Sequence, residues 1–235
     1  MSCPIRAIFV PQGAEFKAVQ RGLNHSPQSS IALYSIPMGP QAIQAYLQQW
    51  QHSELNVLGN SPSVLLMGLC GSLVPELGIG DRVLYRSCLD ARDADSVPQL
   101  DCDATLLKTL QERLGKTVTT VTSLMCDRMV HQATEKQALA LRYGAQVVDM
   151  EGYAFLNALQ STGVAINMLR VVSDDSRHDL PDLSAAMTDN GTLKPMALAA
   201  NMIREPRNAL RLIQGSLKGL KQLEQIASAL KRHTL

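Results

Sequence analysis

The sequence predicts an α/β fold in which a mixed, mostly parallel central sheet is flanked by helices. Short apolar runs alternate with segments that carry apolar residues at helical spacing, which is typical of helix-flanked sheets. The runs are too continuously apolar for an antiparallel sheet with one wet face. A chain of 235 residues has room for one substantial core, so we expect a single domain over residues 1–235.

The predicted strands are runs rich in Val, Ile and Leu, and most of them end in glycine, serine or an acid. They cover residues 5–10, 31–36, 64–67, 82–85, 118–123, 145–148 and 164–172. The predicted helices cover residues 14–23, 41–50, 105–114, 134–143 and 152–161. The segments "HSPQSS" and "DADSVPQLD" predict surface loops by their Ser, Pro and Asp content.

The composition is that of an ordinary soluble globular protein. Hydrophobic residues make up 46% of the chain, and 22 basic residues balance 21 acidic ones, so no nucleic-acid partner is expected. The five cysteines form no CxxC pair, which argues against a disulfide framework or structural zinc and favours a reducing cytoplasm. No cofactor or metal motif is visible, and neither an export signal nor a membrane-spanning run is found.

In such a sheet, ligands gather beyond the carboxyl ends of the strands. The loops at these ends are "PQGAE", "PMGPQ", "GLCGSL", "SLMCDR", "DMEG" and "SDDSRHD". Carboxylates held over a buried sheet can have pKa values that differ widely, so that one acts as an acid while another acts as an acceptor or base. The candidate residues are Glu15, Asp149, Glu151, Asp174 and Asp175, with Gly68 and Gly71 allowing close backbone approach.

Each candidate also has a purely structural interpretation. Acids at the start of a helix, such as Glu15 and the acids of "DMEG", are often caps that complement the helix dipole. "SDDS" also fits an Asx turn, and Gly68 and Gly71 fit a tight turn. The glycines of "GLCGSLVPELGIGD" do not form GxGxxG, and no GK[ST] follows, so a dinucleotide or P-loop site is a poor fit.

Taken in order, these loops resemble the nucleoside phosphorylase and nucleosidase superfamily, most closely its methylthioadenosine/S-adenosylhomocysteine nucleosidase-like branch. The resemblance rests on "FVPQGAEFKAV", "MGLCGSLVPELGIGDRVL", "ARDADS", "VVDMEGYAFLNAL" and "LRVVSDDS". It covers residues 5–190 and implies an enzyme that cleaves the N-glycosidic bond of a purine nucleoside.

The resemblance assigns roles to single residues. Asp174 matches the aspartate that protonates or hydrogen-bonds N7 of the purine, and burial is expected to keep it protonated. Glu15 matches the acid that positions water in hydrolytic members. Met150 and Glu151 match the pair that packs on the ribose and accepts hydrogen bonds from its hydroxyls, whereas Asp149 is expected to be structural.

The glycine-rich loop bears on the type of reaction. Gly68 and Gly71 match the loop beneath the nucleophile, and we group Gly39 of "PMGPQ" with it. Phosphorolytic members hold phosphate here with arginines and a Ser or Thr, whereas "LLMGLCGSL" is apolar, which favours hydrolysis. Leu69 also replaces the hydroxyl that nucleosidases commonly keep. A phosphorylase and a nucleoside-binding protein without turnover therefore stay as alternatives. Arg170 matches a family arginine before the SD pair, but it also fits a structural role at a strand end.

The base-binding segment is "SLMCDRMVHQATEK", which makes Met125 and Cys126 candidates, together with Ser173, which precedes the catalytic aspartate as in the family. The segment lacks the aromatic residue that methylthioadenosine nucleosidases stack on adenine. Met125 can pack on a base, although a Met at a strand end also serves as core filling. The expected substrate is a 5′-substituted adenosine such as methylthioadenosine, adenosylhomocysteine or an adenosyl lipid.

Residues 205–232 predict a C-terminal amphipathic helical extension. From Asn190 onward, eight Lys or Arg stand against two Glu. The segment resembles the tail of hopanoid-associated phosphorylase-like relatives, whose substrates are adenosyl lipids. A basic amphipathic helix can rest on an anionic membrane; the alternative is that its stripe packs on the domain or on a second subunit. The stripe consists of Leu210, Ile213, Leu217, Leu220, Ala227 and Leu230.

The resemblance also implies an assembly. Family members are homo-oligomers in which a neighbour often completes the site, so we expect a dimer or a larger homo-oligomer. The remaining expected partner is a small nucleoside substrate, with no nucleic acid.

Overall fold

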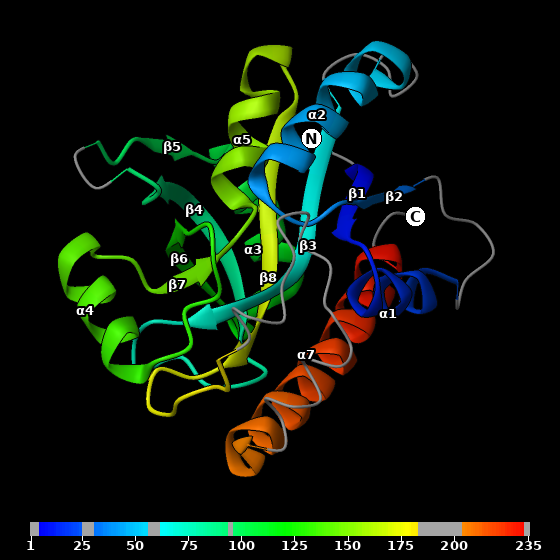
Figure 1. The fold of residues 1–235 in the computed structure, drawn as a ribbon. Coiled ribbons are helices and arrows are strands. Elements are labelled where there is room, and N and C mark those ends of the chain that lie inside the picture. Colours follow the sequence, from blue (N-terminus) through cyan, green and yellow to red (C-terminus); the bar gives the residue numbers. More distant parts are fainter. Residues whose placement is uncertain (1–4, 25–30, 56–61, 94–95, 183–203, 233–235) are drawn as a thin grey trace.

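The computed structural model describes residues 5–24, 31–55, 62–93, 96–182 and 204–232, and Figure 1 shows their arrangement. The strands are β1 (Ile5–Pro11), β2 (Ala32–Ile36), β3 (Ser63–Ser72), β4 (Arg82–Asp90), β5 (Gln99–Asp101), β6 (Val118–Met125), β7 (Val147–Asp149) and β8 (Ala165–Asp174). The α-helices are α1 (Ala14–Asn24), α2 (Pro40–Ser53), α3 (Ala104–Leu114), α4 (Ala133–Tyr143), α5 (Gly152–Leu159) and α7 (Pro206–Arg232). The short 3-10 turns η2 (Gly115–Thr117) and η3 (Gln160–Thr162) follow α3 and α5.

The sheet confirms the predicted α/β class and its mostly parallel pairing. The strand order is β2-β1-β3-β7-β6-β4-β5, and β8 pairs with both β3 and β4. β3 is parallel to β1 and to β8, and β6 is parallel to β4 and to β7. β7 is antiparallel to β3, and β4 is antiparallel to β8. Because β3 pairs with β7 and β8 near its carboxyl end, the ends of these three strands come together.

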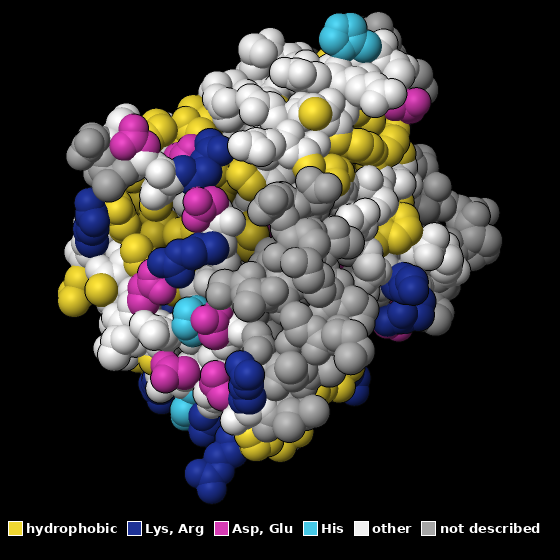
Figure 2. Space-filling view, viewed as in Figure 1, with side chains coloured by type: hydrophobic (Ala, Val, Ile, Leu, Met, Phe, Trp, Pro, Cys, Tyr) yellow, Lys and Arg dark blue, Asp and Glu magenta, His cyan; other side chains and the backbone are white. Residues whose placement is uncertain are grey.

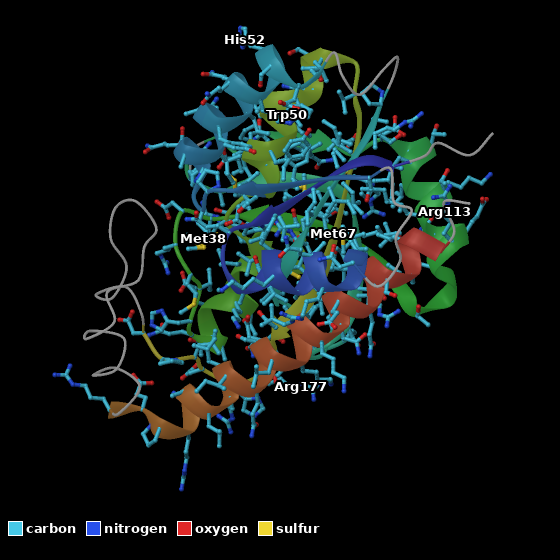
Figure 3. The ribbon with its side chains drawn as sticks, turned by 90° about the vertical axis from the view of Figure 1, so that its right-hand side faces the viewer. Met38, Trp50, His52, Met67, Arg113 and Arg177 are labelled. Carbon is cyan, nitrogen blue, oxygen red and sulfur yellow. The ribbon has the colours of Figure 1, made fainter. Side chains whose placement is uncertain are left out.

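Two helix layers cover the sheet (Figure 3). In that view α2, which carries Trp50, lies with α5 on one side of the strands, and α1 and α7 lie on the other side, with Met67 of β3 in the sheet between them. Separate apolar clusters fill the two sides: Trp50 packs with Phe9 and Phe155 in one cluster, and α1 and α7 supply Val19 and Ile226 to the other. The sheet is therefore buried on both faces, which accounts for its continuously apolar strands.

Two predicted loops have different outcomes. The segment "DADSVPQLD" contains β5, whose Leu100 pairs with Cys88 of β4 in antiparallel register, so the prediction of a loop is wrong for residues 99–101. This edge strand has three residues and two exposed polar ends, too short to show an apolar period. β4 correspondingly runs to Asp90, beyond the predicted residues 82–85. "HSPQSS", residues 25–30, lies outside the described residues.

Helix α7 packs against α1 and β8, but its first half does not do so through the stripe that the sequence suggests. In its first half the inward face carries small residues, and Gly215 and Gly219 are buried, while Leu210, Ile213 and Leu217 are 54%, 43% and 62% exposed. The close approach of α7 to β8 explains why small residues, and not the larger apolar ones, face inward in this half. A Cβ on Gly215 would lie 2.0 Å from the carbonyl oxygen of Ser173 in β8, so a larger inward residue has no room.

The second half of α7 follows the predicted stripe, with Ala227 and Leu230 buried beside Leu223 and Ile226. No helix among the described residues is long and apolar enough to cross a membrane. On the face shown in Figure 2, acidic, basic and histidine side chains are interspersed over α4 and the segment after β8. Charge of one sign is not concentrated in this area.

Gly215→Ala tests the close approach of α7. In an unconstrained helix the change would stabilise the protein by up to about 1 kcal/mol. Here the added methyl would meet a backbone oxygen at 2.0 Å, so we expect the free energy of unfolding to fall by roughly 1–3 kcal/mol, as for other overpacked sites. Urea unfolding measures it.

Gly219→Ala in the same helix is the control. Its methyl would meet Leu69 Cδ2 at 2.7 Å, the mobile end of a side chain, so its cost should be smaller. A Gly215→Ala variant as stable as the Gly219→Ala variant, or more so, contradicts this account of the docking.

Candidate active site

The carboxyl ends of β3, β7 and β8 meet at one cavity of about 540 Å³. In the register of the sheet, Gly71 lies opposite Asp174 of β8 and opposite Val148 of β7. β3 thus lies between the two strands, with β7 on one edge and β8 on the other. Of the residues predicted for the site, those lining this cavity are Glu15, Gly71, Asp149, Met150, Glu151, Ser173 and Asp174.

Two glycines of β3 leave room for charged side chains from β8. A Cβ on Gly68 would lie 2.1 Å from Arg170 Nη1, and a Cβ on Gly71 would lie 2.8 Å from Asp174 Oδ2. Gly68 is also the register partner of Arg170. Both glycines are part of β3, so they are not simply turn residues. Their missing side chains let a guanidinium and a carboxylate lie over the neighbouring strand.

Arg170 is the buried centre of charge. Its side chain is 0% exposed, and Nη2 lies 3.2 Å from Asp149 Oδ2 and 3.4 Å from Glu151 Oε2. Tyr85 also donates its hydroxyl to Asp149 Oδ2 at 3.1 Å. Burial lowers the pKa of Arg170, but Asp149 and Glu151 outweigh burial, so that the pKa is raised. The two acids thus hold the guanidinium charged inside the protein.

Asp149 and Glu151 are both buried and both line the cavity, but their hydrogen bonds differ. Asp149 Oδ1 accepts from the N–H of Gly152 at 3.0 Å, at the start of α5. Glu151 occupies the N-cap position of α5, but its side chain makes no capping hydrogen bond. Burial raises the pKa of Glu151 to about 7, with Arg170 acting in the opposite direction. Of the two acids, Asp149 is therefore the one that caps α5.

Glu15 lies in the first turn of α1, but its carboxylate points across to β3. Oε1 accepts from the backbone N–H of Leu69 at 2.8 Å. Burial raises the pKa of Glu15, while the charge of Arg170 and the Leu69 N–H oppose that rise. Since its carboxylate accepts a hydrogen bond from β3, helix capping does not account for Glu15. The side chain of Leu69 lies close to Gly219 of α7.

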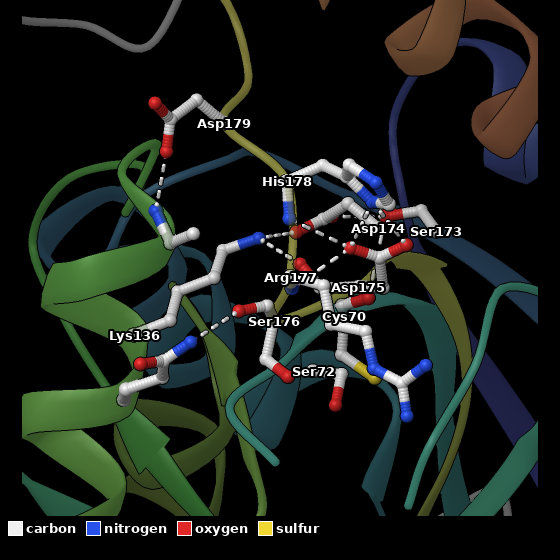
Figure 4. Close-up of polar contacts among 12 residues, drawn as sticks. Cys70, Ser72, Lys136, Ser173, Asp174, Asp175, Ser176, Arg177, His178 and Asp179 are labelled. Atoms are coloured by element: carbon white, nitrogen blue, oxygen red, sulfur yellow. Dashed lines mark hydrogen bonds and ion pairs between the residues drawn. The ribbon is translucent and has the colours of Figure 1, made fainter. Parts of the chain in front are cut away.

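Asp174 is held by donors on both oxygens (Figure 4). Ser173 Oγ donates to Oδ1 at 2.8 Å, and the Nζ of Lys136 donates to Oδ2. The predicted picture of an acid kept protonated by burial alone is therefore incomplete, because a lysine lies against it. Asp175 has a different position: its Oδ1 accepts from the backbone N–H groups of Arg177 and His178, so the Asx-turn interpretation applies to this second aspartate.

Four of the predicted site residues do not line the cavity as the structure describes it: Gly39, Gly68, Met125 and Cys126. Met125 is fully buried in the core, where its Sδ accepts from Ala154 N at 3.4 Å. Met125 is therefore a core residue. The next turn of the chain supplies Met129 and Val130 to the cavity instead, and Met38 lines it in place of the adjoining Gly39.

Two sets of functional residues were not singled out from the sequence. Helix α7 contributes Leu212, Ser216 and Leu220 to the cavity wall, although we had expected an extension. Lys136 ends the segment predicted to bind the base, but it was not named as a candidate. One signal was available: Lys136 precedes Leu139 and Ala140, which pack against the core, by three and four positions, so all three share one face of α4.

Cysteine and metal chemistry have little support in the described part of the chain. Cys70, Cys88, Cys102 and Cys126 are free thiols there. Burial raises the pKa of Cys126 to about 12, and burial also raises that of Cys70. Thiolates are therefore disfavoured. No group of three or more potential metal ligands occurs among these residues.

Comparisons with known proteins place this geometry in a family. The sequence model of the Phosphorylase superfamily matches residues 9–204. No curated protein sequence matches the chain. Among solved structures, futalosine hydrolase of Helicobacter pylori is similar with a TM-score of 0.70 and 15% identity, over 97% of each chain.

Two further similar structures are 5′-methylthioadenosine/S-adenosylhomocysteine nucleosidases. That of Helicobacter pylori has a TM-score of 0.68 and 15% identity over 98% of each chain. That of Neisseria meningitidis has a TM-score of 0.69 and 13% identity, over 97% of this chain and 100% of the other. At these identities the structural similarity shows the fold. The sequence model spans β1 to the start of α7, including all the strands around the cavity, and on that match the chain belongs to the phosphorylase superfamily.

Proposed function

We propose that the protein hydrolyses the N-glycosidic bond of a purine nucleoside, an adenosine that carries a substituent at its 5′ position. The observation that carries this proposal is that Glu15, Glu151 and Asp174 line one cavity. Similar structures include a nucleosidase of Helicobacter pylori with 5′-methylthioadenosine in its active site. The family allows either hydrolysis or phosphorolysis, so the choice depends on the charges of this chain.

The reaction needs charge control at both ends of the breaking bond. As the bond from C1′ to the base breaks, its electron pair goes to the base and positive charge grows on the ribose. A proton from Asp174 to N7 of the purine stabilises the leaving group. The Glu151 carboxylate accepts hydrogen bonds from the ribose hydroxyls and stabilises the positively charged sugar, while Met150 packs on it. Glu15 orients a water molecule and takes its proton as the water oxygen bonds to C1′.

The charges around the cavity favour water over phosphate. Arg170 is fully buried and already paired with Asp149 and Glu151, and Glu15 adds a third acid close enough to affect its pKa. Arg170 does not line the cavity, and the arginine that does, Arg128, is bound to Glu135. A multiply charged anion would meet carboxylates without a free cation among the described lining residues. Water carries no such penalty.

The walls of the cavity support an apolar 5′ substituent. Leu212 and Leu220 of α7 line it, together with Met38 and Leu69. Figure 3 shows Met38 just beyond β2, at the end of the sheet where α1 begins. A thioether or alkyl substituent bound there would bury this apolar surface. Each Å² of apolar area removed from water contributes roughly 25 cal/mol to the free energy of binding.

Asp174→Asn tests the proposed acid. The amide keeps the size of the side chain but has no carboxyl proton to give, so we expect base release to fall at least about 100-fold. The assay follows free base from methylthioadenosine, adenosylhomocysteine, adenosine and inosine, with and without phosphate. Asp101→Asn on exposed β5 is the control and should keep wild-type turnover.

Three results would count against the proposal in different ways. Turnover by Asp174→Asn at the wild-type rate removes Asp174 from its role. Base release only in the presence of phosphate identifies a phosphorylase. A thermal shift with nucleoside and no base release by the wild-type protein identifies the binding protein that Leu69 suggests.

The pKa of Glu151 predicts how binding depends on pH. The ribose hydroxyls bind best to the ionised carboxylate, and because burial raises its pKa to about 7, acidification through that value protonates it. We expect the affinity for an uncleavable carbocyclic nucleoside to fall by up to about tenfold per pH unit below about 7 and to level off above it. Calorimetric titration between pH 5.5 and 8.5 measures this.

Glu151→Gln should bind more weakly at pH 8 and lose most of the pH dependence. Glu76→Gln, at an exposed position, should keep the wild-type curve. If the wild-type affinity does not change across this range, ionised Glu151 is not the group that holds the ribose.

A further inference from the structure

Lys136 of α4 is a fully buried lysine, with 0% of its side chain exposed. Lysines are almost never fully buried unless they are paired. Its Nζ donates to Asp174 Oδ2 and, at 2.9 Å, to the backbone carbonyl of Asp175. Asp174 is the last residue of β8 and Asp175 is the next residue, so a single ammonium holds the end of this strand (Figure 4).

The pairing leaves Asp174 little freedom to turn. Ser173 Oγ holds Oδ1, and Lys136 holds Oδ2. The carboxyl group is thus held at both oxygens while it still lines the cavity. A proton donor needs such fixed geometry, because proton transfer requires heavy-atom distances of about 2.6–3.2 Å.

The other charged groups nearby have partners of their own. Arg170 is held by Asp149 and Glu151, and the carboxylate of Asp175 contacts His178 Nδ1 at 3.0 Å. The guanidinium of Arg177 donates to the carbonyl of Pro75. Among the ion pairs of the described residues, the one that Asp174 makes is with Lys136.

We propose that Lys136 is a positioning residue that orients Asp174 toward the leaving base and stabilises the carboxylate that remains when Asp174 gives up its proton. This inference rests on the proposed nucleosidase function. The proton on Asp174 passes to N7 of the base, which receives the electron pair of the broken bond, and Lys136 keeps its own proton throughout. An ammonium beside the carboxylate favours the ionised form, so the energy of the transition state falls as the proton leaves.

Lys136→Met, alone and combined with Asp174→Asn, tests the proposal in a double-mutant cycle. In the wild-type background we expect kcat to fall by about 10- to 100-fold with little change in KM. In the Asp174→Asn background the same change should lower kcat by less than about threefold, because two residues that act together are not additive. Lys108→Met, at an exposed position of α3, is the matched control.

Lys136→Gln provides the same measurement if the methionine variant shows no cooperative thermal unfolding, since an amide keeps a donor without the charge. Lys136→Arg keeps the charge and should retain most of the wild-type kcat. Equal losses of kcat in both backgrounds, or the wild-type kcat in a folded neutral variant, would overturn the proposal for Lys136, while base release by the wild-type protein leaves the nucleosidase function standing. If the wild-type protein releases no base from any nucleoside, both proposals fail.

Discussion

The arrangement of the site depends on the burial of Arg170 between carboxylates. A guanidinium taken out of water is costly unless opposite charge lies beside it, and here Asp149 and Glu151 lie 3.2 Å and 3.4 Å from its Nη2. The acids depend on Arg170 in turn, because the same guanidinium opposes the rise that burial causes in the pKa of Glu15 and Glu151. These acids can therefore be ionised near neutral pH while they remain in an apolar cavity.

Close packing of backbones makes this arrangement possible. Gly68 leaves space for the guanidinium on the neighbouring strand, Gly71 leaves space for Asp174, and Gly215 lets α7 approach the carbonyl of Ser173. In each case a missing side chain on one element makes room for a functional group on another. The helix that closes the cavity thus docks through its small residues and leaves larger apolar residues of its first half outside.

The fold was predictable because strands buried on both faces leave a strong apolar signal, and only the edge strand β5 lacks one. Glu15, Glu151 and Asp174 were predictable as cavity residues because they follow strand ends that must meet. The site predictions that were wrong or missing have a common cause. Met125 and Met129 are four positions apart, and only the structure shows that Met125 packs in the core and that Met129 lines the cavity. Lys136 and Gly215 act through partners distant in sequence, which one chain cannot reveal by its spacing.

The balance of charge on the two sides of the cavity follows the charge that the proposed reaction creates. Glu15, Asp149 and Glu151 gather around one guanidinium, where positive charge would grow on the sugar, whereas Asp174 has an ammonium of its own. An excess of acids disfavours an anionic nucleophile and favours a cationic sugar. A carboxyl group beside an ammonium forms a pair that becomes neutral once the carboxyl proton has passed to the leaving group, which must end uncharged. The same pattern would serve a phosphorylase poorly, since phosphate would have to enter on the side where acids outnumber the buried cation.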